Sequence, residues 1–361
     1  GARSLHRAAI NLRGGAAKVA QLTAYFEGPD ALAGEESRAT LEDLFDRLPG
    51  SDPEGVRRLF TTDLGRPPEE VFASFDAQPF AAASLGEVHG ARDQTGAEYA
   101  VKIQYPGVDQ ALAADLQSAT VLHKLTGGAM GRAIPADARD ALRAAVLAEV
   151  DYRAEADFLQ RFRRAFRADR QIVIPKVFPD RSGPRVLTTE RLHGQRLPDF
   201  LRGGPAADRA TVAVLLFRYG FGGPLVHGLL NADPNPGNYL VLGSGAELRV
   251  GFLDYGCCIE LPEATQRCDQ VMWQALLARD GEGLRFALHR EGLIREPIEF
   301  DSNRYRAWER CLAEPFQSTD FLWSSDYARS LAELTSALVC GGRFTLPAPA
   351  LLLWRQRLGL S

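Results

Sequence analysis

One stretch of the chain restricts its fold more than any other, because it places polar residues on either side of a short hairpin. Asp233 and Asn238 lie five residues apart in a run rich in proline and glycine. Two strand-like segments follow, at residues 239–242 and 248–253, and a Gly-Ser-Gly turn joins them. Asp254 comes directly after the second segment. The sequence therefore predicts two polar segments that flank a hairpin.

The composition is that of a folded globular chain. Its 361 residues are 45% hydrophobic and 24% charged, which excludes a disordered or fibrous protein and is enough for a core in two lobes or domains. The 42 basic residues and 46 acidic residues give a net charge of -4. Because no overall basic field is present, we expect no nucleic-acid partner.

Cysteine usage and hydropathy indicate the compartment. The five cysteines are odd in number and include no C-x-x-C pair, so neither a disulfide framework nor a cysteine zinc site is indicated. No apolar run reaches the roughly 20 residues of a membrane-spanning helix. We expect a cytoplasmic protein without a transmembrane segment, and peripheral membrane contact stays open. Only four lysines stand among the 42 basic residues, a bias typical of a GC-rich bacterial genome.

The hydrophobic period changes along the chain and predicts an α+β protein. Apolar residues at helical spacing predict helices within residues 5–26 and 56–64. Between residues 72 and 105 the pattern alternates around an Asp-Gln-Thr-Gly turn, which predicts a β-hairpin with Lys102 inside its second strand. Further elements are expected as follows: one long helix over 137–168, strands at 172–178 and 185–192, and mainly helices from residue 262 onward.

Phosphoryl transfer requires the residue types found around the second hairpin. It needs a carboxylate near the attacking hydroxyl, an oxygen ligand for one metal ion and a second carboxylate for another. Asp233, Asn238 and Asp254 match the D-x-x-x-x-N and D-x-G spacing that kinases use. Each piece alone is equally typical of a turn or a strand end. Their order, after an alanine- and glycine-bearing turn, an Ala-Val-Lys strand and a helix glutamate, favours a kinase-type site.

These motifs together resemble the UbiB/ADCK family of atypical kinases. The resemblance spans roughly residues 12–358 and is carried by four runs: F-A-A-A-S-L-G-E-V-H at 80–89, A-V-K-I-Q-Y-P-G-V at 100–108, E-V-D-Y-R-A-E-A at 149–156 and N-A-D-P-N-P-G-N at 231–238. It implies a bilobal protein-kinase-like α+β fold with a small β-rich N-lobe, a helical C-lobe and an N-terminal helical extension over the cleft. The implied domains are the extension at 1–68, the N-lobe at 69–193 and the C-lobe at 194–361.

The resemblance also implies roles for individual residues. Asp233 would act on the acceptor hydroxyl, and Lys102 would contact the nucleotide phosphates while it pairs with Glu155. Asn238 and Asp254 would bind Mg2+. The nucleotide, ATP or ADP, would lie against the alanine loop and the linker between the lobes, which together contribute Ala81, Ala82, Ala83, Ser84, Gly86, Lys102, Glu190 and Leu192.

A motif near the start of the chain implies a gate over the cleft. Residues 18–21, Lys-Val-Ala-Gln, resemble the family's K-x-G-Q motif with alanine in place of glycine. In the family this segment crosses the cleft, where Lys18 would meet a carboxylate of the E-x-D element and Gln21 would lie near the phosphates. We take Glu149, rather than Asp151, as that carboxylate. Such a gate disfavours peptide substrates.

Other positions also depart from the family pattern. Asn231 and Asn235 stand where members commonly have histidine, which leaves reduced turnover open. Glu87 replaces the usual glutamine beside the alanine loop. We expect this carboxylate either to repel phosphate or to face solvent.

The sequence predicts an ATP-dependent atypical kinase that transfers the γ-phosphoryl group to a hydroxyl of a small-molecule or lipid-like acceptor. Two alternatives remain. One is an ATPase that supports quinone or isoprenoid-lipid biosynthesis, and the other is a nucleotide-binding pseudokinase with a regulatory role. The full set of kinase-type polar residues favours turnover, whereas Asn231 and the alanine loop keep the pseudokinase alternative open.

Overall fold

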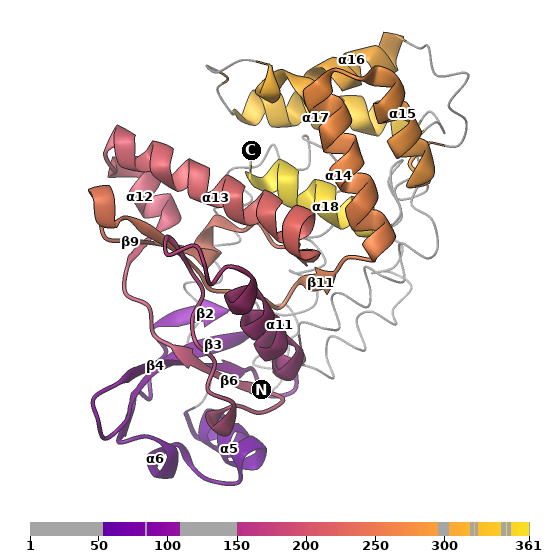
Figure 1. Cartoon of the computed structure of the whole chain (residues 1–361). Helices are drawn as coiled ribbons and strands as arrows, with labels where there is room; N and C mark the ends of the chain where they lie inside the picture. Colours follow the sequence, from indigo (N-terminus) through magenta and orange to yellow (C-terminus); the bar gives the residue numbers. More distant parts are fainter. Residues whose placement is uncertain are drawn as a thin grey trace, which may run out of the picture.

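A five-stranded antiparallel sheet forms the N-terminal part of the described protein (Figure 1). It contains β1 (Ser74–Phe75), β2 (Ala81–Ala83), β3 (Gly86–Arg92), β4 (Glu98–Gln104) and β6 (Val186–Glu190). Strands β3 and β4 pair along their whole length, which confirms the hairpin predicted from the alternating pattern. This computed structural model describes residues 53–83, 85–108, 150–294, 303–317, 321, 324–340, 344 and 348–360.

The two faces of this sheet differ because side chains alternate along a strand. Val101 and Ile103 of β4 are buried on the face that packs against α5 (Pro53–Leu64). Lys102 lies between them in the chain and contacts α11 (Tyr152–Ala165) on the other face. Helices α5 and α11 therefore cover opposite faces, and the alternation decides which face carries the polar site.

Helix α11 begins later than the sequence predicted. Residues 109–149 lie outside the described part of the chain, and Asp151 has an extended backbone with φ −106° and ψ 94°. Its carboxylate accepts a hydrogen bond from the backbone N–H of Arg153, which makes Asp151 the N-cap of the helix. The expectation of one continuous helix over 137–168 is therefore wrong, because the cap starts a new helix at Tyr152.

Strands from distant parts of the chain build a second sheet. Its order is β5-β10-β9-β7, with β5 at Ile172–Val173, β7 at Gln195–Arg196, β9 at Tyr239–Leu242 and β10 at Arg249–Phe252. Strands β9 and β10 form the predicted second hairpin, whereas β5 joins β10 in parallel. The short 3-10 helix η2 (Pro236–Asn238) precedes this hairpin. The polar segments therefore lie at the same end of β9 and β10.

Helices dominate the described residues after the first sheet, as predicted for the C-terminal half (Figure 1). Their bounds are α12 (Leu197–Gly203), α13 (Ala206–His227), α14 (Glu263–Ala278), α15 (Gly281–Arg290), α16 (Asn303–Ala313), α17 (Ser325–Cys340) and α18 (Ala348–Leu360). The remaining elements are α6 (Pro68–Val71), η1 (Pro179–Arg181), η3 (Gly245–Glu247), η4 (Glu314–Phe316) and the paired strands β8 (Leu229–Asn231) and β11 (Cys258–Glu260). Helix α18 packs against α13 and against β8.

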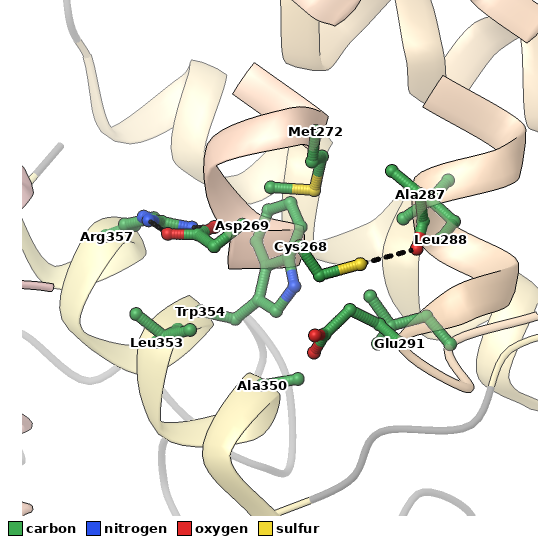
Figure 2. A pocket seen from close by; sticks show the side chains of 11 residues that line it. Cys268, Asp269, Met272, Ala287, Leu288, Glu291, Ala350, Leu353, Trp354 and Arg357 are labelled. Atoms are coloured by element: carbon green, nitrogen blue, oxygen red, sulfur yellow. Dashed lines mark hydrogen bonds and ion pairs between the residues drawn. The ribbon is translucent and has the colours of Figure 1, made fainter. Parts of the chain in front are cut away.

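The C-terminal helices share a hydrophobic cluster. A pocket between α14, α15 and α18 has mainly apolar walls, with Cys268 and Glu291 on one side (Figure 2). Arg357 of α18 and Asp269 of α14 form a buried ion pair beside it, with a closest distance of 2.5 Å. Within the described ranges, no helix has the length and apolar character needed to cross a bilayer.

Candidate active site

A lysine–glutamate ion pair connects the first sheet to α11. Lys102 Nζ donates to Glu155 Oε1 at 2.8 Å and to Oε2 at 2.9 Å, and the Glu155 side chain is only 1% exposed. Burial raises the pKa of Glu155 to about 6, against the opposing effect of Lys102. Burial acts to lower the pKa of Lys102, but the carboxylates of Asp254 and Glu155 outweigh it and raise that pKa well above its usual range. The predicted partners of Lys102 are thus in contact, and the lysine stays cationic.

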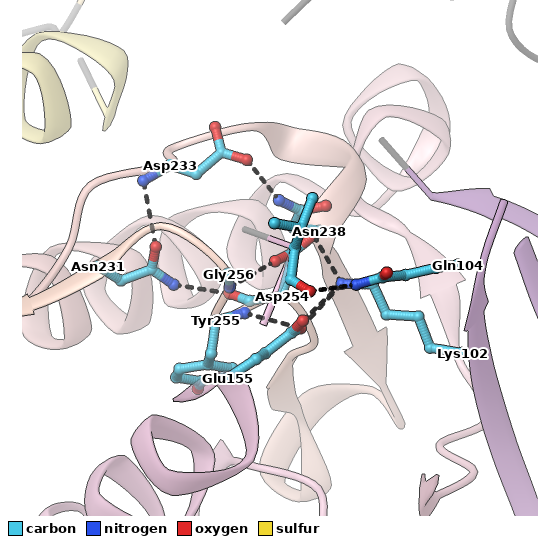
Figure 3. A network of polar contacts seen from close by, with 10 residues as sticks. Lys102, Gln104, Glu155, Asn231, Asp233, Asn238, Asp254, Tyr255 and Gly256 are labelled. Carbon is cyan, nitrogen blue, oxygen red and sulfur yellow. Dashed lines mark hydrogen bonds and ion pairs between the residues drawn. The ribbon is translucent and has the colours of Figure 1, made fainter. Parts of the chain in front are cut away.

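Asp254 reaches the same ion pair from the other half of the chain (Figure 3). Its Oδ2 lies 3.6 Å from Lys102 Nζ, and its Oδ1 accepts a hydrogen bond of 2.9 Å from the backbone N–H of Gly256. The next residue, Tyr255, donates its backbone N–H to Glu155 Oε1 at 3.4 Å. With 22% of its side chain exposed, Asp254 remains accessible to a ligand.

The segment before the second hairpin brings Asp233 and Asn238 together. Asn238 Nδ2 donates to Asp233 Oδ2 at 3.1 Å. The backbone N–H of Leu253 donates to the Asn238 carbonyl at 3.0 Å, which fixes this segment beside the residue that precedes Asp254. The prediction of two polar segments flanking a hairpin is confirmed.

Asn231 connects these two segments directly (Figure 3). Its Oδ1 accepts the backbone N–H of Asp233 at 3.1 Å, and its Nδ2 donates to the Asp254 carbonyl at 2.9 Å and to the Tyr219 hydroxyl at 3.2 Å. The second departure from the family pattern, Asn235, has a local task, because its side chain accepts the Gly237 N–H and caps η2. The Asn231 amide therefore forms a bridge between the segments without an imidazole.

Arg355 of α18 makes one further contact at the site, which was not predicted from the sequence. Arg355 Nη2 lies 3.3 Å from Asp233 Oδ1, and its Nη1 lies 3.7 Å from Cys257 Sγ. The side chain is 2% exposed. A Cβ added to Gly359, one turn further along α18, would lie 2.2 Å from Pro234 Cγ, so the helix packs directly on the Asp233 segment. The available signal was a run of three polar residues, Arg-Gln-Arg at 355–357, in a helix whose other residues are apolar.

The alanines of the expected phosphate loop form strand β2 rather than an open loop. Ala81 pairs with Val88 of β3, and Ala83 pairs with Gly86. A Cβ on Gly86 would lie 2.3 Å from the Ile103 carbonyl oxygen, so this position requires glycine. Ala82 pairs with the next residue of β3.

Residues of the expected linker follow β4 in the sheet. Glu190 ends β6 and pairs with Tyr99 of β4, and its carboxylate accepts the backbone N–H of Lys176. Leu192 lies beyond the strand, where its Cδ1 would be 3.0 Å from a Cβ added to Gly251. The linker therefore runs from the first sheet to the second one.

Both expectations for Glu87 are wrong. Val88 lies directly opposite Lys102 in the β3–β4 ladder, so Glu87 points to the other face of the sheet. It is 2% exposed there, and its Oε1 lies 3.1 Å from His89 Nε2. A buried position on the far face neither contacts solvent nor faces the Lys102 side, where phosphate was expected.

Other predicted residues lie outside the described part of the chain, namely Lys18, Gln21, Ser84 and Glu149. The helix expected within residues 5–26 lies outside it as well.

Comparisons with known proteins agree on the kind of fold. A family model described as the ABC1 atypical kinase-like domain matches residues 43–288. An uncharacterised Mycobacterium tuberculosis protein is 35% identical over 257 residues, which cover 68% of this chain and 51% of that protein. The mitochondrial atypical kinase COQ8 of Schizosaccharomyces pombe is 30% identical over 253 residues, which cover 70% of this chain and 40% of that kinase. The chain thus spans about half the length, or less, of these curated relatives.

A solved structure is similar over nearly the whole chain. The Mycobacterium tuberculosis protein Rv3197, determined as a complex with erythromycin, superposes with a TM-score of 0.60 at 26% sequence identity. The match covers 99% of this chain and 94% of Rv3197. The order of elements in the described residues is therefore shared with a protein that was solved with a bound small molecule.

Proposed function

Because the chain belongs to the ABC1 atypical kinase-like family, as the match to COQ8 also indicates, we propose that it is an ATP-dependent phosphotransferase. It transfers the γ-phosphoryl group of ATP to a hydroxyl of a small-molecule or lipid-like acceptor. The observation that carries this proposal is the single polar network that joins the Lys102–Glu155 ion pair, Asp254 and the Asp233–Asn238 pair.

Lys102 contacts the nucleotide phosphates in this proposal. Its ion pair with Glu155 keeps the ammonium group oriented, and a fixed cation at this point attracts phosphate oxygens. In this proposal the phosphates lie against Ala81, Ala82 and Ala83 of β2, Ser84, and Gly86 at the start of β3. The backbone at Glu190 and Leu192 binds the edge of the base. Membership of the family supports these assignments.

The side chains of Asn238 and Asp254 have the donor atoms that Mg2+ prefers. The side-chain nitrogen of Asn238 donates a hydrogen bond to Asp233. Its side-chain oxygen, Oδ1, is therefore the atom suited to a cation. Mg2+ typically takes one or two protein oxygen ligands together with phosphate oxygens and water, and these two residues fit that pattern. When bound, the ion would neutralise charge that develops on the transferred phosphoryl group.

Asp233 orients the acceptor hydroxyl and receives its proton. Arg355 and Asn238 hold the two carboxylate oxygens, and each oxygen can accept a further hydrogen bond. In the transfer step, the acceptor oxygen forms a bond to the γ-phosphorus while the bond from that phosphorus to the bridging oxygen of ADP breaks. The hydroxyl proton moves to Asp233, and ADP leaves with the electron pair of the broken bond.

The division into lobes and the gate belong to the same proposal. Residues 69–193 form the N-lobe around the first sheet, and residues 194–361 form the helical C-lobe. Within the extension at 1–68, Lys18 and Gln21 close the cleft to peptides, and Glu149 receives Lys18. The family match over residues 43–288 supports the N-lobe and the first part of the C-lobe, and the gate rests on the sequence motif at residues 18–21.

The acceptor is a small molecule rather than a protein. Support comes from Rv3197, which was solved as a complex with erythromycin and matches almost the whole chain. A macrolide carries several hydroxyl groups, so it has the chemistry that the Asp233 carboxylate requires. Bacterial relatives in Mycobacterium and Pseudomonas support a bacterial source, and a cytoplasmic location is part of the proposal.

The test measures ADP and phosphate release by the purified protein with Mg2+ and ATP, with and without a panel of hydroxyl compounds that includes erythromycin. ADP release that depends on an acceptor supports the kinase, acceptor-independent release supports the ATPase alternative, and nucleotide binding without release supports the pseudokinase. Asp233→Asn should lower turnover roughly 10²–10⁴-fold while nucleotide affinity is retained. Asp254→Asn should remove the Mg2+-dependent part of the thermal shift that ADP produces. A wild-type protein without nucleotide binding would contradict the proposal.

A further inference from the structure

The hydroxyl of Tyr152 is a buried polar group beside the proposed site. Tyr152 is the first residue of α11, its side chain is 1% exposed, and its hydroxyl has no hydrogen-bond partner among the described residues. Buried hydroxyl groups are normally paired in folded proteins, because an unpaired one has lost its hydrogen bonds to water. The Tyr152 hydroxyl is therefore a group to which a bound ligand could supply the missing hydrogen-bond partner.

The position of Tyr152 identifies the ligand group that it can reach. Lys102 Nζ lies 4.9 Å from the centre of the Tyr152 ring. A Cβ added to Gly86 would lie 2.9 Å from the Tyr152 hydroxyl oxygen, so the hydroxyl occupies the space where another residue would place its side chain. Gly86 precedes Val88 by two residues, and Val88 is opposite Lys102, so Gly86 and Lys102 share one face of the sheet.

The hydroxyl at this position acts as a donor. Burial raises the pKa of Tyr152 well above its ordinary value, although Lys102 opposes the shift, so the group keeps its proton at neutral pH. A donor next to a lysine ammonium group suits an anionic ligand that offers several acceptor oxygens. A phosphate group has that chemistry.

We propose that Tyr152 is a nucleotide-binding residue whose hydroxyl donates a hydrogen bond to a phosphate oxygen held between Lys102 and Gly86. The inference rests on the proposed function, because it assumes that a nucleotide binds on the Lys102 face of the sheet. It adds a third kind of contact to the lysine charge and the turn backbone. Gly86 is required in this scheme because any side chain there would displace the hydroxyl.

The test compares wild-type protein with Tyr152→Phe, which removes only the hydroxyl and keeps the ring beside Lys102. Calorimetry measures the Kd of Mg-ADP and of adenosine, and thermal unfolding is followed without ligand. We expect the Kd of Mg-ADP to rise at least fivefold, the Kd of adenosine to stay unchanged, and the ligand-free Tm to stay equal or increase. The matched control, Tyr305→Phe, alters another buried tyrosine in α16 and should leave both Kd values unchanged.

Three results would overturn the inference. The first is an unchanged Kd of Mg-ADP in Tyr152→Phe when the wild-type protein binds Mg-ADP. The second is an equal loss of affinity for ADP and adenosine, because adenosine has no phosphate and the hydroxyl would then not act through a phosphate contact. The third is a lower ligand-free Tm, because the hydroxyl would then have a partner within the protein. Failure of the wild-type protein to bind ADP would instead reject the proposed function, and this inference with it.

Discussion

A single amide side chain, Asn231, holds the two polar segments of the site in register. It accepts a hydrogen bond from the segment of Asp233 and donates one to the segment of Asp254. Both contacts are in the interior, where the groups left behind by a truncation cannot all reach water. The residue that departs from the family pattern therefore retains a structural function that a shorter side chain would lose.

Replacement of Asn231 by alanine should destabilise the protein and lower its turnover together. The loss of buried partners costs about 1–3 kcal/mol in the free energy of unfolding, measured by urea denaturation. Asn235→Ala is the control, because Asn235 caps only the short η2 and its loss should cost less, about 1 kcal/mol. Equal stability of the two variants would contradict the bridging function of Asn231.

The sequence predicted correctly which motif residues come together. It did not predict to which face of a strand a side chain points. The contact between Lys102 and Glu155 was implied by the resemblance to the UbiB/ADCK family and is present at 2.8 Å. Glu87 was misplaced because adjacency to the alanine run was given more weight than strand alternation, which sends it away from Lys102. Arg355 was missed because it lies 122 residues from Asp233 and belongs to no motif.

Among the elements, α18 has an unexpected part in the site. Two of its residues one turn apart meet consecutive residues of the Asp233 segment: Arg355 contacts Asp233, and Gly359 packs on Pro234. The same helix holds a second buried arginine, Arg357, whose partner is Asp269 on the side of the pocket in Figure 2. One helix thus provides both a test residue and its matched control.

Arg355→Lys should lower kcat about 10- to 100-fold with little change in the KM for ATP, because lysine keeps the charge but lacks the planar guanidinium group whose two nitrogens contact Asp233 and Cys257. Arg357→Lys is expected to lower Tm about as much as Arg355→Lys does, but to leave the kcat of the folded protein unchanged. Steady-state kinetics and thermal unfolding of both variants provide the measurements. If both variants lose kcat equally, α18 contributes general stability only.

Element boundaries followed from the sequence where the determinants were local. The β3–β4 hairpin is predicted by its alternation and its polar turn, and it is present as expected. The start of α11 was misjudged, because apolar spacing around Asp151 continues through a residue that acts as a cap. The parallel pairing of β5 with β10 joins segments that are distant in the sequence. It could not be predicted, because local periodicity does not show which strands pair.

At the scale of the whole molecule, family membership supplied what periodicity left open. The α+β class and the sequence of elements followed from the pattern, whereas the kinase-like arrangement came from motif order and is supported by the match over residues 43–288. The packing among α14, α15 and α18 could not be predicted in the same way, since apolar helices can be assembled in several arrangements. That packing places the Glu291 carboxyl group at a largely apolar pocket.

The stability of the protein should therefore depend on pH through Glu291. Burial raises the pKa of Glu291 to about 7 from an ordinary value near 4.5, so between these values the folded state binds more protons than the unfolded state. The contribution of Glu291 is fully present below the lower value and is lost as the pH rises through 7. We expect Tm to fall from pH 5 to pH 8 more in the wild-type protein than in Glu291→Gln. Parallel Tm profiles would contradict this.

The contact between α18 and the Asp233 segment also sets the time at which activity can first appear during synthesis. Ribosomes add about 5–20 residues per second, so the 122 residues between Asp233 and Arg355 take roughly 6–24 s to synthesise. For most of that interval, once Asp254 has been added, a nascent chain carries Lys102, Asp233 and Asp254 without the arginine that contacts Asp233. A partly translated chain is thus able to fold its first sheet and to meet nucleotide before it can use the nucleotide efficiently. In the proposed reaction, the late helix delays full turnover until nearly all of the described chain has been made.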